Sequence, residues 1–200
     1  MDLKQLDRVV RGVALPPWFE LFERHYFLLD RDYDFWWFTE TLKNGMYTRY
    51  TLKGQCLKPD GWGCGSAYLY AKLSFHPFRG ETTVYIEDIV TSKRSVQIGS
   101  WMMVRFIEFL RAWDRVLIVK RVWGHLSPVD EYEENKERRD AFFKKFGFRI
   151  KETERDKFVE AEPENLSTRP LDGIEEIPLA KLVERCVSAL SPVTRWAEEG

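Results

Sequence analysis

The stretch that decides the fold is KRSVQIGSWMMVRFIEFLRAW, residues 93–113. It begins as a polar turn, passes one glycine at Gly99 and continues as an apolar run with a thin charged stripe. The stripe consists of Arg105, Glu108 and Arg111 at i, i+3 spacing, which predicts a helix covered on most sides. Because a strand-like run ends at the turn, the sequence predicts a strand, a turn and a helix in direct succession.

The start of this helix is a candidate anion site. Backbone N–H groups at a helix N-terminus can face an anion, and a side chain at Gly99 would block its close approach. Arg94 supplies a positive charge just upstream and Ser100 supplies a hydroxyl, so a phosphate or pyrophosphate would be well held. The alternative is that Gly99 only relieves strain where a tightly packed helix begins. On local grounds both interpretations stay open.

The composition predicts one compact domain with an appendage. The chain has 200 residues, of which 44% are hydrophobic and 15% aromatic, enough for one sizeable core. Its 31 basic and 32 acidic side chains nearly cancel, so no overall charge attracts nucleic acid or an anionic membrane. We therefore expect neither as a partner.

Cysteine usage and the apolar runs predict a cytoplasmic protein. The three cysteines, Cys56, Cys64 and Cys186, are odd in number and form no C-x-x-C pair, so they suggest neither a disulfide framework nor a zinc ribbon. The N-terminal residues lack the apolar core of a signal peptide, and no apolar run is long enough to span a bilayer.

The rest of the chain divides into periodic segments. Before the quoted stretch we expect a strand at 6–15, a helix at 18–29 after two prolines, a helix at 30–45 capped by aspartates, and an antiparallel meander of strands at 46–57, 66–75 and 82–90. After it we expect a strand at 116–126, a helix at 133–146 ended by Gly147, a charged alternating strand at 148–162 and a final helix at 178–190.

This order of elements resembles the GCN5-related N-acetyltransferase (GNAT) family. The family's acyl-CoA turn reads R/Q-x-x-G-x-G/A, and residues 94–99 fit it with Gln97 in place of the first glycine. A later family motif reads N-x-x-A-x-x-x-Y-x-x-x-G-F, and RRDAFFKKFGF, residues 138–148, keeps its ending with Phe143 where the tyrosine stands. Asn135 lies one position off the usual spacing of the asparagine.

The resemblance covers about residues 6–158. It implies an α/β fold of the α+β type, with a mostly antiparallel mixed sheet flanked by helices. A GNAT-like domain would then span residues 1–160, and residues 161–200 would form a C-terminal extension with one helix. Acetyl-CoA is the implied cofactor, and its implied contacts are Ile89, Val90, Arg94, Ser95, Val96, Gln97, Ile98, Gly99, Ser100, Asn135 and Phe143.

The implied chemistry needs a base, an oxyanion donor and an acid. Glu87 and Asp88 are adjacent in a strand, and alternation sends them to opposite faces, so one should face a covered layer. Burial away from partners raises the pKa of a carboxylate toward the value that a general base needs, and family members often place a glutamate on this strand, which favours Glu87. The alternative is that Arg and Lys from neighbouring strands satisfy both acids. A main-chain N–H between residues 85 and 90 would hold the oxyanion, and Ser127 or Tyr132 would protonate the leaving thiolate.

Other polar residues have simpler interpretations. His125 could be a base, although a lone histidine at a strand end is more often structural. The three histidines show no metal-ligand spacing, so we expect no metal. Tyr33, Trp36 and Trp37 with the nearby aspartates could form a mouth for a cationic amine, although core packing is the more frequent role of such aromatic residues.

The sequence therefore favours an acetyl-CoA-dependent N-acetyltransferase. Its acceptor would be a small-molecule amine or a protein amine, and the protein would be a monomer or homodimer. One alternative is a non-catalytic GNAT-like domain that binds CoA or a protein partner, with residues 179–190 as a docking helix. Another is an acetyltransferase toxin acting on charged tRNA, which the near-neutral charge disfavours.

Overall fold

The computed structural model describes residues 23–43, 48–57, 65–76, 78–93, 97–115, 118–126, 133–154 and 156–180. Several predicted features lie outside these ranges: the strand at 6–15, most of the helix at 178–190, and the site residues Arg94, Ser95, Val96, Ser127 and Tyr132.

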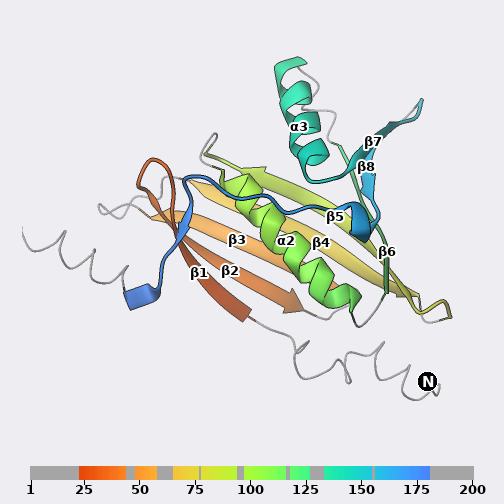
Figure 1. Cartoon of the computed structure of the whole chain (residues 1–200), viewed down its shortest axis with the longest axis horizontal. Helices are drawn as coiled ribbons and strands as arrows, with labels where there is room; N and C mark the ends of the chain where they lie inside the picture. Colours follow the sequence, from red (N-terminus) through yellow and green to blue (C-terminus); the bar gives the residue numbers. More distant parts are fainter. Residues whose placement is uncertain are drawn as a thin grey trace, which may run out of the picture.

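One sheet joins all the described strands, in the order β7-β8-β6-β5-β4-β3-β2-β1-β9 (Figure 1). The strands are β1 (Glu23–Leu29), β2 (Phe35–Lys43), β3 (Thr48–Leu57), β4 (Ser66–His76), β5 (Glu81–Thr91), β6 (Ile118–His125), β7 (Arg149–Glu152), β8 (Lys157–Ala161) and β9 (Glu175–Glu176). Every described pair is antiparallel except β5 with β6, which is parallel. The mixed α+β sheet that the sequence predicts is confirmed.

Strands β3, β4 and β5 form the predicted antiparallel meander. In each of them buried and solvated side chains alternate, as in a sheet with one covered face. The covered positions of β4, for example, are Ala67, Leu69, Ala71 and Leu73. The alternation of apolar and polar residues in the sequence predicted these strands because only one of their faces is apolar.

The two helices predicted at 18–29 and 30–45 are wrong, because the described parts of these segments form two strands and the turn between them. β1 and β2 form a hairpin in which Leu29 pairs with Phe35. The turn is built on Asp30, whose carboxylate accepts hydrogen bonds from the backbone N–H of Asp32 at 2.8 Å and of Asp34 at 3.1 Å. The aspartates therefore form a side-chain-supported turn, and the aromatic residues behind them favour a strand.

Helix α2 (Ile98–Asp114) covers one face of the sheet, running across the middle strands in Figure 1. The predicted helix is confirmed. Its apolar side packs on the sheet through ring contacts, with centroids 4.7 Å apart for Trp101 and Phe38 and 5.4 Å apart for Phe106 and Tyr50. Burial of such large rings supplies most of the stabilising free energy of this layer.

A buried carboxylate lies under α2. Glu40 is 3% exposed, and its two oxygens accept hydrogen bonds from the hydroxyls of Tyr26 at 2.7 Å and Tyr50 at 2.9 Å. Burial, together with the nearby Glu40 charge, raises the pKa of Tyr26 to about 12. Both oxygens of this buried acid are therefore satisfied by hydroxyls of the same layer.

Helix α3 (Glu133–Lys145) and the β7–β8 hairpin complete the other end of the sheet. The helix ends at Lys145, and Gly147 follows it as the predicted stop; this glycine has φ 92°, a conformation that favours glycine after a helix. The single strand expected at 148–162 is wrong, because Thr153 and Asp156 form a turn, with a 2.8 Å hydrogen bond from the Thr153 N–H to the Asp156 carbonyl, that folds it into two strands.

The segment after β8 returns across α2, as the blue coil in Figure 1 shows. It passes through the short 3-10 helix η3 (Pro163–Asn165) and ends in β9, which pairs with β1. Trp101 donates a 2.8 Å hydrogen bond from its indole N–H to Glu176, and Arg111 donates to the Leu166 carbonyl at 3.0 Å. Residues 162–177 are therefore packed on the helix layer; the proposed domain boundary after residue 160 stays a prediction.

Two findings bear on the cysteine and membrane expectations. Cys56 is disulfide-bonded to a cysteine outside the described residues, a single pair that the sequence analysis did not predict. An odd number of cysteines still permits one pair. Among the described helices, none is long and apolar enough to cross a membrane. The cytoplasmic location stays a prediction.

Candidate functional site

Strand β5 contains a bulge at Glu87. In its pairing with β4, Ile86 lies opposite Ala71 and Asp88 lies opposite Tyr70, which are consecutive residues. Glu87 is therefore the extra residue, with no partner of its own on β4. A bulge bends its strand and re-aims the side chains that follow, which explains why alternation places Glu87 and Asp88 wrongly: both line the same polar hollow on the face of the sheet away from α2.

Strands β5 and β6 part beside this bulge. Their parallel pairing runs from Glu81 with Ile118 to Tyr85 with Trp123 and goes no further. β6 continues in contact with β8, where His125 pairs with Phe158, while β5 continues with β4 to Thr91. We call this opening the fork: residues 86–91 of β5 on one side and residues 124–125 of β6 on the other.

Gly124 lies where the fork begins. A Cβ atom built on this glycine would lie 2.8 Å from the Ile86 carbonyl oxygen and 3.1 Å from the Ile86 Cβ. No side chain fits at that distance, so the glycine allows the two strands to stay in contact up to the point where they separate. The signal for this role was the single glycine in the strand-like run before His125.

The start of α2 lies next to the end of β5. A Cβ atom on Gly99 would lie 3.8 Å from Thr91 at the end of β5 and 3.7 Å from the ring of Phe142 on α3, which are ordinary contact distances. Gly99 therefore faces the space between these two elements. An alanine fits there, whereas a longer side chain would occupy the space.

Gln97 precedes the helix in a left-handed conformation, φ 61° and ψ 9°, the region that a glycine adopts most easily. Its side chain makes no cap for α2 and instead donates to the Asp172 carbonyl at 3.0 Å, toward the C-terminal segment. The first N–H groups of a helix have no acceptor within the helix. The glutamine thus leaves the backbone at the start of α2 uncapped by its own side chain.

Lys145 adds a cation that the sequence analysis missed. Its ammonium donates a 2.7 Å hydrogen bond to the hydroxyl of the buried Ser100, in the first turn of α2, and lies about 5 Å from the ring centroids of Phe142 and Phe146. Burial and the nearby Arg169 charge lower the pKa of Lys145 below its ordinary value. Among the described residues no carboxylate pairs with it, so an anion at this helix end would meet an uncompensated positive charge.

Glu87 is held between two cations. Its carboxylate lies 2.5 Å from the ammonium of Lys72 and 3.4 Å from the guanidinium Nε of Arg49, and its side chain is 23% exposed. This is the ion-paired arrangement that the alternative interpretation describes, rather than a carboxylate buried away from partners. The neighbouring Asp88 is exposed and accepts a hydrogen bond from the hydroxyl of Tyr68.

The other predicted cofactor contacts lie at different depths. Ile89 is partly buried against the core and Val90 is 37% exposed, both on the free part of β5. Phe143 is 6% exposed and packs edge-on against Phe142 and Phe148, so it belongs to the core of this end. Asn135, on α3, accepts a 2.8 Å hydrogen bond from Arg138.

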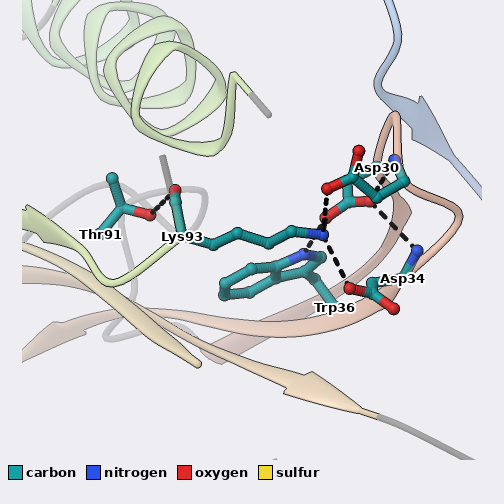
Figure 2. A network of polar contacts seen from close by, with 6 residues as sticks. Asp30, Asp34, Trp36, Thr91 and Lys93 are labelled. Atoms are coloured by element: carbon teal, nitrogen blue, oxygen red, sulfur yellow. Dashed lines mark hydrogen bonds and ion pairs between the residues drawn. The ribbon is translucent and has the colours of Figure 1, made fainter. Parts of the chain in front are cut away.

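The turn between β5 and α2 is anchored at Lys93. Figure 2 shows the Lys93 side chain extending over the indole of Trp36 toward the β1–β2 turn. Its ammonium lies 2.9 Å from Asp30, 2.9 Å from Asp32 and 2.7 Å from Asp34. Burial lowers the pKa of Lys93, but the bonds to the three aspartates outweigh it and raise the pKa above its ordinary value. These aspartates hold a cation of the chain itself, while Trp36 is fully buried and Trp37 is 42% exposed.

His125 lies at the end of β6 among aromatic rings. Its ring centroid is 5.4 Å from that of Trp123 and 6.1 Å from that of Tyr85, and it is exposed. In the part of the chain that the structure describes, no group of three His, Cys, Asp or Glu side chains could hold a metal ion.

No protein-family model matches the chain, and no curated protein matches it. The structure is similar to solved GNAT acetyltransferases at low sequence identity. Arabidopsis thaliana Naa50, in complex with the bisubstrate analogue CoA-Ac-MVNAL, is 18% identical with a TM-score of 0.38, over 56% of this chain and 72% of that one. Nourseothricin acetyltransferase is 16% identical with a TM-score of 0.31, over 64% of this chain and 66% of that one. At these values the similarity says nothing of activity or acceptor.

Proposed function

We propose that the chain is an acetyl-CoA-dependent N-acetyltransferase whose cofactor lies in the fork. The observation that carries this proposal is that three features meet there: the bulge at Glu87, the end of the β5–β6 pairing, and the start of α2, which the Gln97 side chain does not cap, beside Lys145. The first two open a strand edge inside a sheet, and the third provides an anion site at its mouth.

The free edge of β5 suits an extended ligand that carries amides. Past Tyr85, the edge of residues 86–91 that faces β6 pairs with no strand among the described residues. Unpaired strand edges bind extended chains through backbone hydrogen bonds. The pantetheine arm of acetyl-CoA is such a chain. The pyrophosphate of acetyl-CoA would lie against the backbone N–H groups of Ile98, Gly99 and Ser100, with the Lys145 ammonium near its negative charge. Acetyl-CoA supplies the thioester that is cleaved.

Glu87 is proposed as the base. The acceptor nitrogen forms a bond to the acetyl carbonyl carbon, the carbon–sulfur bond breaks, and the proton of the amine goes to the Glu87 carboxylate directly or through a water. The cations of Lys72 and Arg49 keep the carboxylate in place at the bulge. A main-chain N–H of the free part of β5 would hold the oxyanion.

The proton for the departing CoA thiolate needs a separate source. Phe143 has no proton to donate, and its ring is buried among other rings. Ser127 and Tyr132 stay proposed donors. Without a positioned acid the thiolate leaves unassisted or takes a proton from water, so we expect slow turnover.

Binding of acetyl-CoA by the wild-type chain tests the proposal. A ligand that binds only the folded state raises the melting temperature. We expect a rise that grows with the acetyl-CoA concentration and is absent in the Gly99→Glu variant, with Gly99→Ala behaving like the wild type. No rise at any concentration in the folded wild type would reject the cofactor and, with it, the transferase.

A second function, binding of CoA without transfer, is favoured by one pair of observations: Glu87 is already ion-paired and Phe143 stands where a proton donor would be needed. Release of CoA in the presence of a broad panel of amines separates the two. A binding protein shows the rise in melting temperature but no release above the hydrolysis background, and Phe143→Tyr does not change this.

A further inference from the structure

Lys93 joins two parts of the chain that are far apart in the sequence. It follows the end of β5, and its ammonium reaches Asp30, which lies 63 residues earlier. Figure 2 shows its side chain passing over the indole of Trp36 to the β1–β2 turn, while its carbonyl accepts a 2.9 Å hydrogen bond from the Thr91 hydroxyl. Both ends of this residue are therefore fixed, one on its own strand and one on a distant turn.

The turn that receives the ammonium is built around a buried charge. The Asp30 side chain is fully buried, and its carboxylate also accepts a 2.8 Å hydrogen bond from the indole N–H of Trp36 and bonds from two backbone N–H groups of the turn. A buried carboxylate needs a cation and hydrogen-bond donors around it to stay charged. The position of Lys93 is therefore determined by Asp30.

A second link holds the other side of the β5–α2 turn. Gln97, directly before α2, donates from its side-chain amide to the Asp172 carbonyl at 3.0 Å. The next residue, Gly173, lies against Arg31 of the β1–β2 turn, so closely that an added Cβ would collide with the arginine side chain. Side-chain contacts thus connect the β1–β2 turn, the C-terminal segment and both ends of the β5–α2 turn. We call these contacts the junction: residues 30–34, 93, 97 and 172–173.

The junction holds the β5–α2 turn without using the N–H groups at the start of α2. Lys93 and Gln97 are both held through donors of their side chains. The first backbone bond of the helix runs from the N–H of Trp101 to the Gln97 carbonyl at 2.9 Å. The N–H groups of residues 98–100 come before it and have no acceptor inside the helix. The contacts that fix the turn therefore leave these N–H groups to an anion.

We infer that Lys93 is a positioning residue for acetyl-CoA: its link to the β1–β2 turn fixes the start of α2 in the arrangement that receives the pyrophosphate. This rests on the proposed function, because it gives Lys93 a role in that same cofactor site. A segment that is already held in its binding conformation loses less conformational entropy when the ligand binds, which increases the affinity. Lys93 acts through the turn and not on the phosphates, because three carboxylates surround its ammonium.

Three variants and two ligands separate positioning from plain stability. Lys93→Met removes the ammonium and keeps an aliphatic chain over Trp36, and Lys93→Arg restores the charge. Arg105→Met is the matched control: it removes a cation that ties α2 to Glu176 on β9, about two turns beyond the start of the helix. The ligands are acetyl-CoA and S-acetylpantetheine, which has the same thioester and amides but no phosphates.

Affinities are measured by NMR titration. Wild type should bind acetyl-CoA more tightly than S-acetylpantetheine, since only acetyl-CoA uses the N–H groups at the start of α2. Lys93→Met should weaken acetyl-CoA binding about tenfold and leave S-acetylpantetheine binding unchanged, and Lys93→Arg should recover most of the loss. Arg105→Met should lower the melting temperature and change neither affinity. Weaker binding of both ligands to Lys93→Met, or an equal loss in Arg105→Met, would indicate a general effect on folding and overturn the inference.

Lys93→Met also leaves the buried Asp30 carboxylate without its cation, which destabilises the chain. Asp32→Ala/Asp34→Ala tests the same link with Lys93 and Asp30 in place, because it removes the two carboxylates whose side chains are 60% and 26% exposed. This change makes the region more positive, so a direct attraction between Lys93 and the phosphates would strengthen acetyl-CoA binding. Positioning predicts binding weaker by about threefold, with S-acetylpantetheine again unchanged. Tighter or equal acetyl-CoA binding would contradict the role of Lys93.

Failure of this inference and failure of the proposed function give different results. If the wild type binds acetyl-CoA no better than S-acetylpantetheine, the phosphate site at α2 is absent, and the proposed cofactor site fails together with the role of Lys93. If the wild type prefers acetyl-CoA and Lys93→Met keeps that preference undiminished, the cofactor site stands and Lys93 has no positioning role.

Discussion

The two halves of β5 belong to one strand but differ in the strands they pair with. The first half, Glu81–Tyr85, pairs with β4 on one side and β6 on the other, and its inward side chains Thr82 and Val84 are fully buried. The second half, residues 86–91, pairs with β4 and with no other strand that the structure describes. The bulge residue Glu87 lies near the start of the second half.

This difference shows how a sheet can hold a ligand site inside its own plane. A strand with two neighbours has every backbone group paired, and it offers a ligand nothing but its side chains. A strand that loses one neighbour offers a free backbone edge while its other edge keeps it rigid. The first half of β5 is structural, and the second half is where acetyl-CoA is proposed to bind.

The largest effect is expected from Gly99→Glu, at the start of α2 beside the free half. The carboxylate would fill the space between Thr91 and Phe142 and repel the pyrophosphate, so acetyl-CoA affinity should fall at least about a hundredfold. Calorimetric titration measures the affinity, and circular dichroism checks the fold. The control is Gly99→Ala, whose Cβ meets only ordinary contacts. Unchanged affinity in a folded Gly99→Glu protein would place the phosphates elsewhere.

The second largest effect is expected from Glu87→Gln, which removes the proposed base near the start of the second half of β5. We expect the rate of CoA release with an accepted amine to fall about a hundredfold, because general base catalysis typically contributes that much. Acetyl-CoA affinity should not change. The rate should then recover as the pH rises toward the pKa of the amine, since the free amine needs no base.

The matched control for Glu87→Gln is Glu81→Gln, in the paired half of the same strand. Its rate should equal that of the wild type. If the two variants lose the same activity, the bulge has no special role and the contrast between the halves is broken.

Gly124→Ala tests the point where the fork begins and β5 and β6 are still in contact. The added Cβ would lie 2.8 Å from the backbone oxygen of Ile86, which cannot move without shifting β5. Overpacking of this kind costs about 1–3 kcal/mol of unfolding free energy. Urea denaturation measures it, with Gly99→Ala as the comparison. A stability equal to that of the wild type would mean that the strands do not approach as closely at this point.

The smallest effect is expected from Lys145→Gln. Loss of one cation near the pyrophosphate should weaken acetyl-CoA binding about tenfold and reduce the dependence of the affinity on salt. Lys144→Gln, one residue earlier and exposed, should bind as the wild type does. Equal losses in both variants would indicate a general charge effect rather than a contact at Ser100.

The sequence predicts those helices and strands that depend on local residue patterns. The apolar run after Gly99 gave α2, strict alternation gave β3 to β5, and Gly147 marked the end of α3. These features are set by residues within one or two turns of one another. The hairpin of β1 and β2 was missed because its aspartates resemble helix caps when their partner Lys93, 63 residues from Asp30, is not considered.

The features that make the fork a candidate binding site depend on contacts between segments that are distant in the sequence. A bulge is a property of two strands, so Glu87 reads as an ordinary alternating residue in its own strand. Lys145 meets Ser100 from 45 residues away and looks like a solvated lysine in a charged helix. The role of Gly124 is set by Ile86 on the neighbouring strand.

The most direct test of the fork is hydrogen exchange of the two halves of β5 with and without acetyl-CoA. Exchange reports the opening of individual backbone segments. The account predicts that acetyl-CoA slows exchange in residues 86–91 and 97–100 while residues 81–85 exchange as before. Protection confined to other elements, or equal protection of both halves of β5, would contradict it.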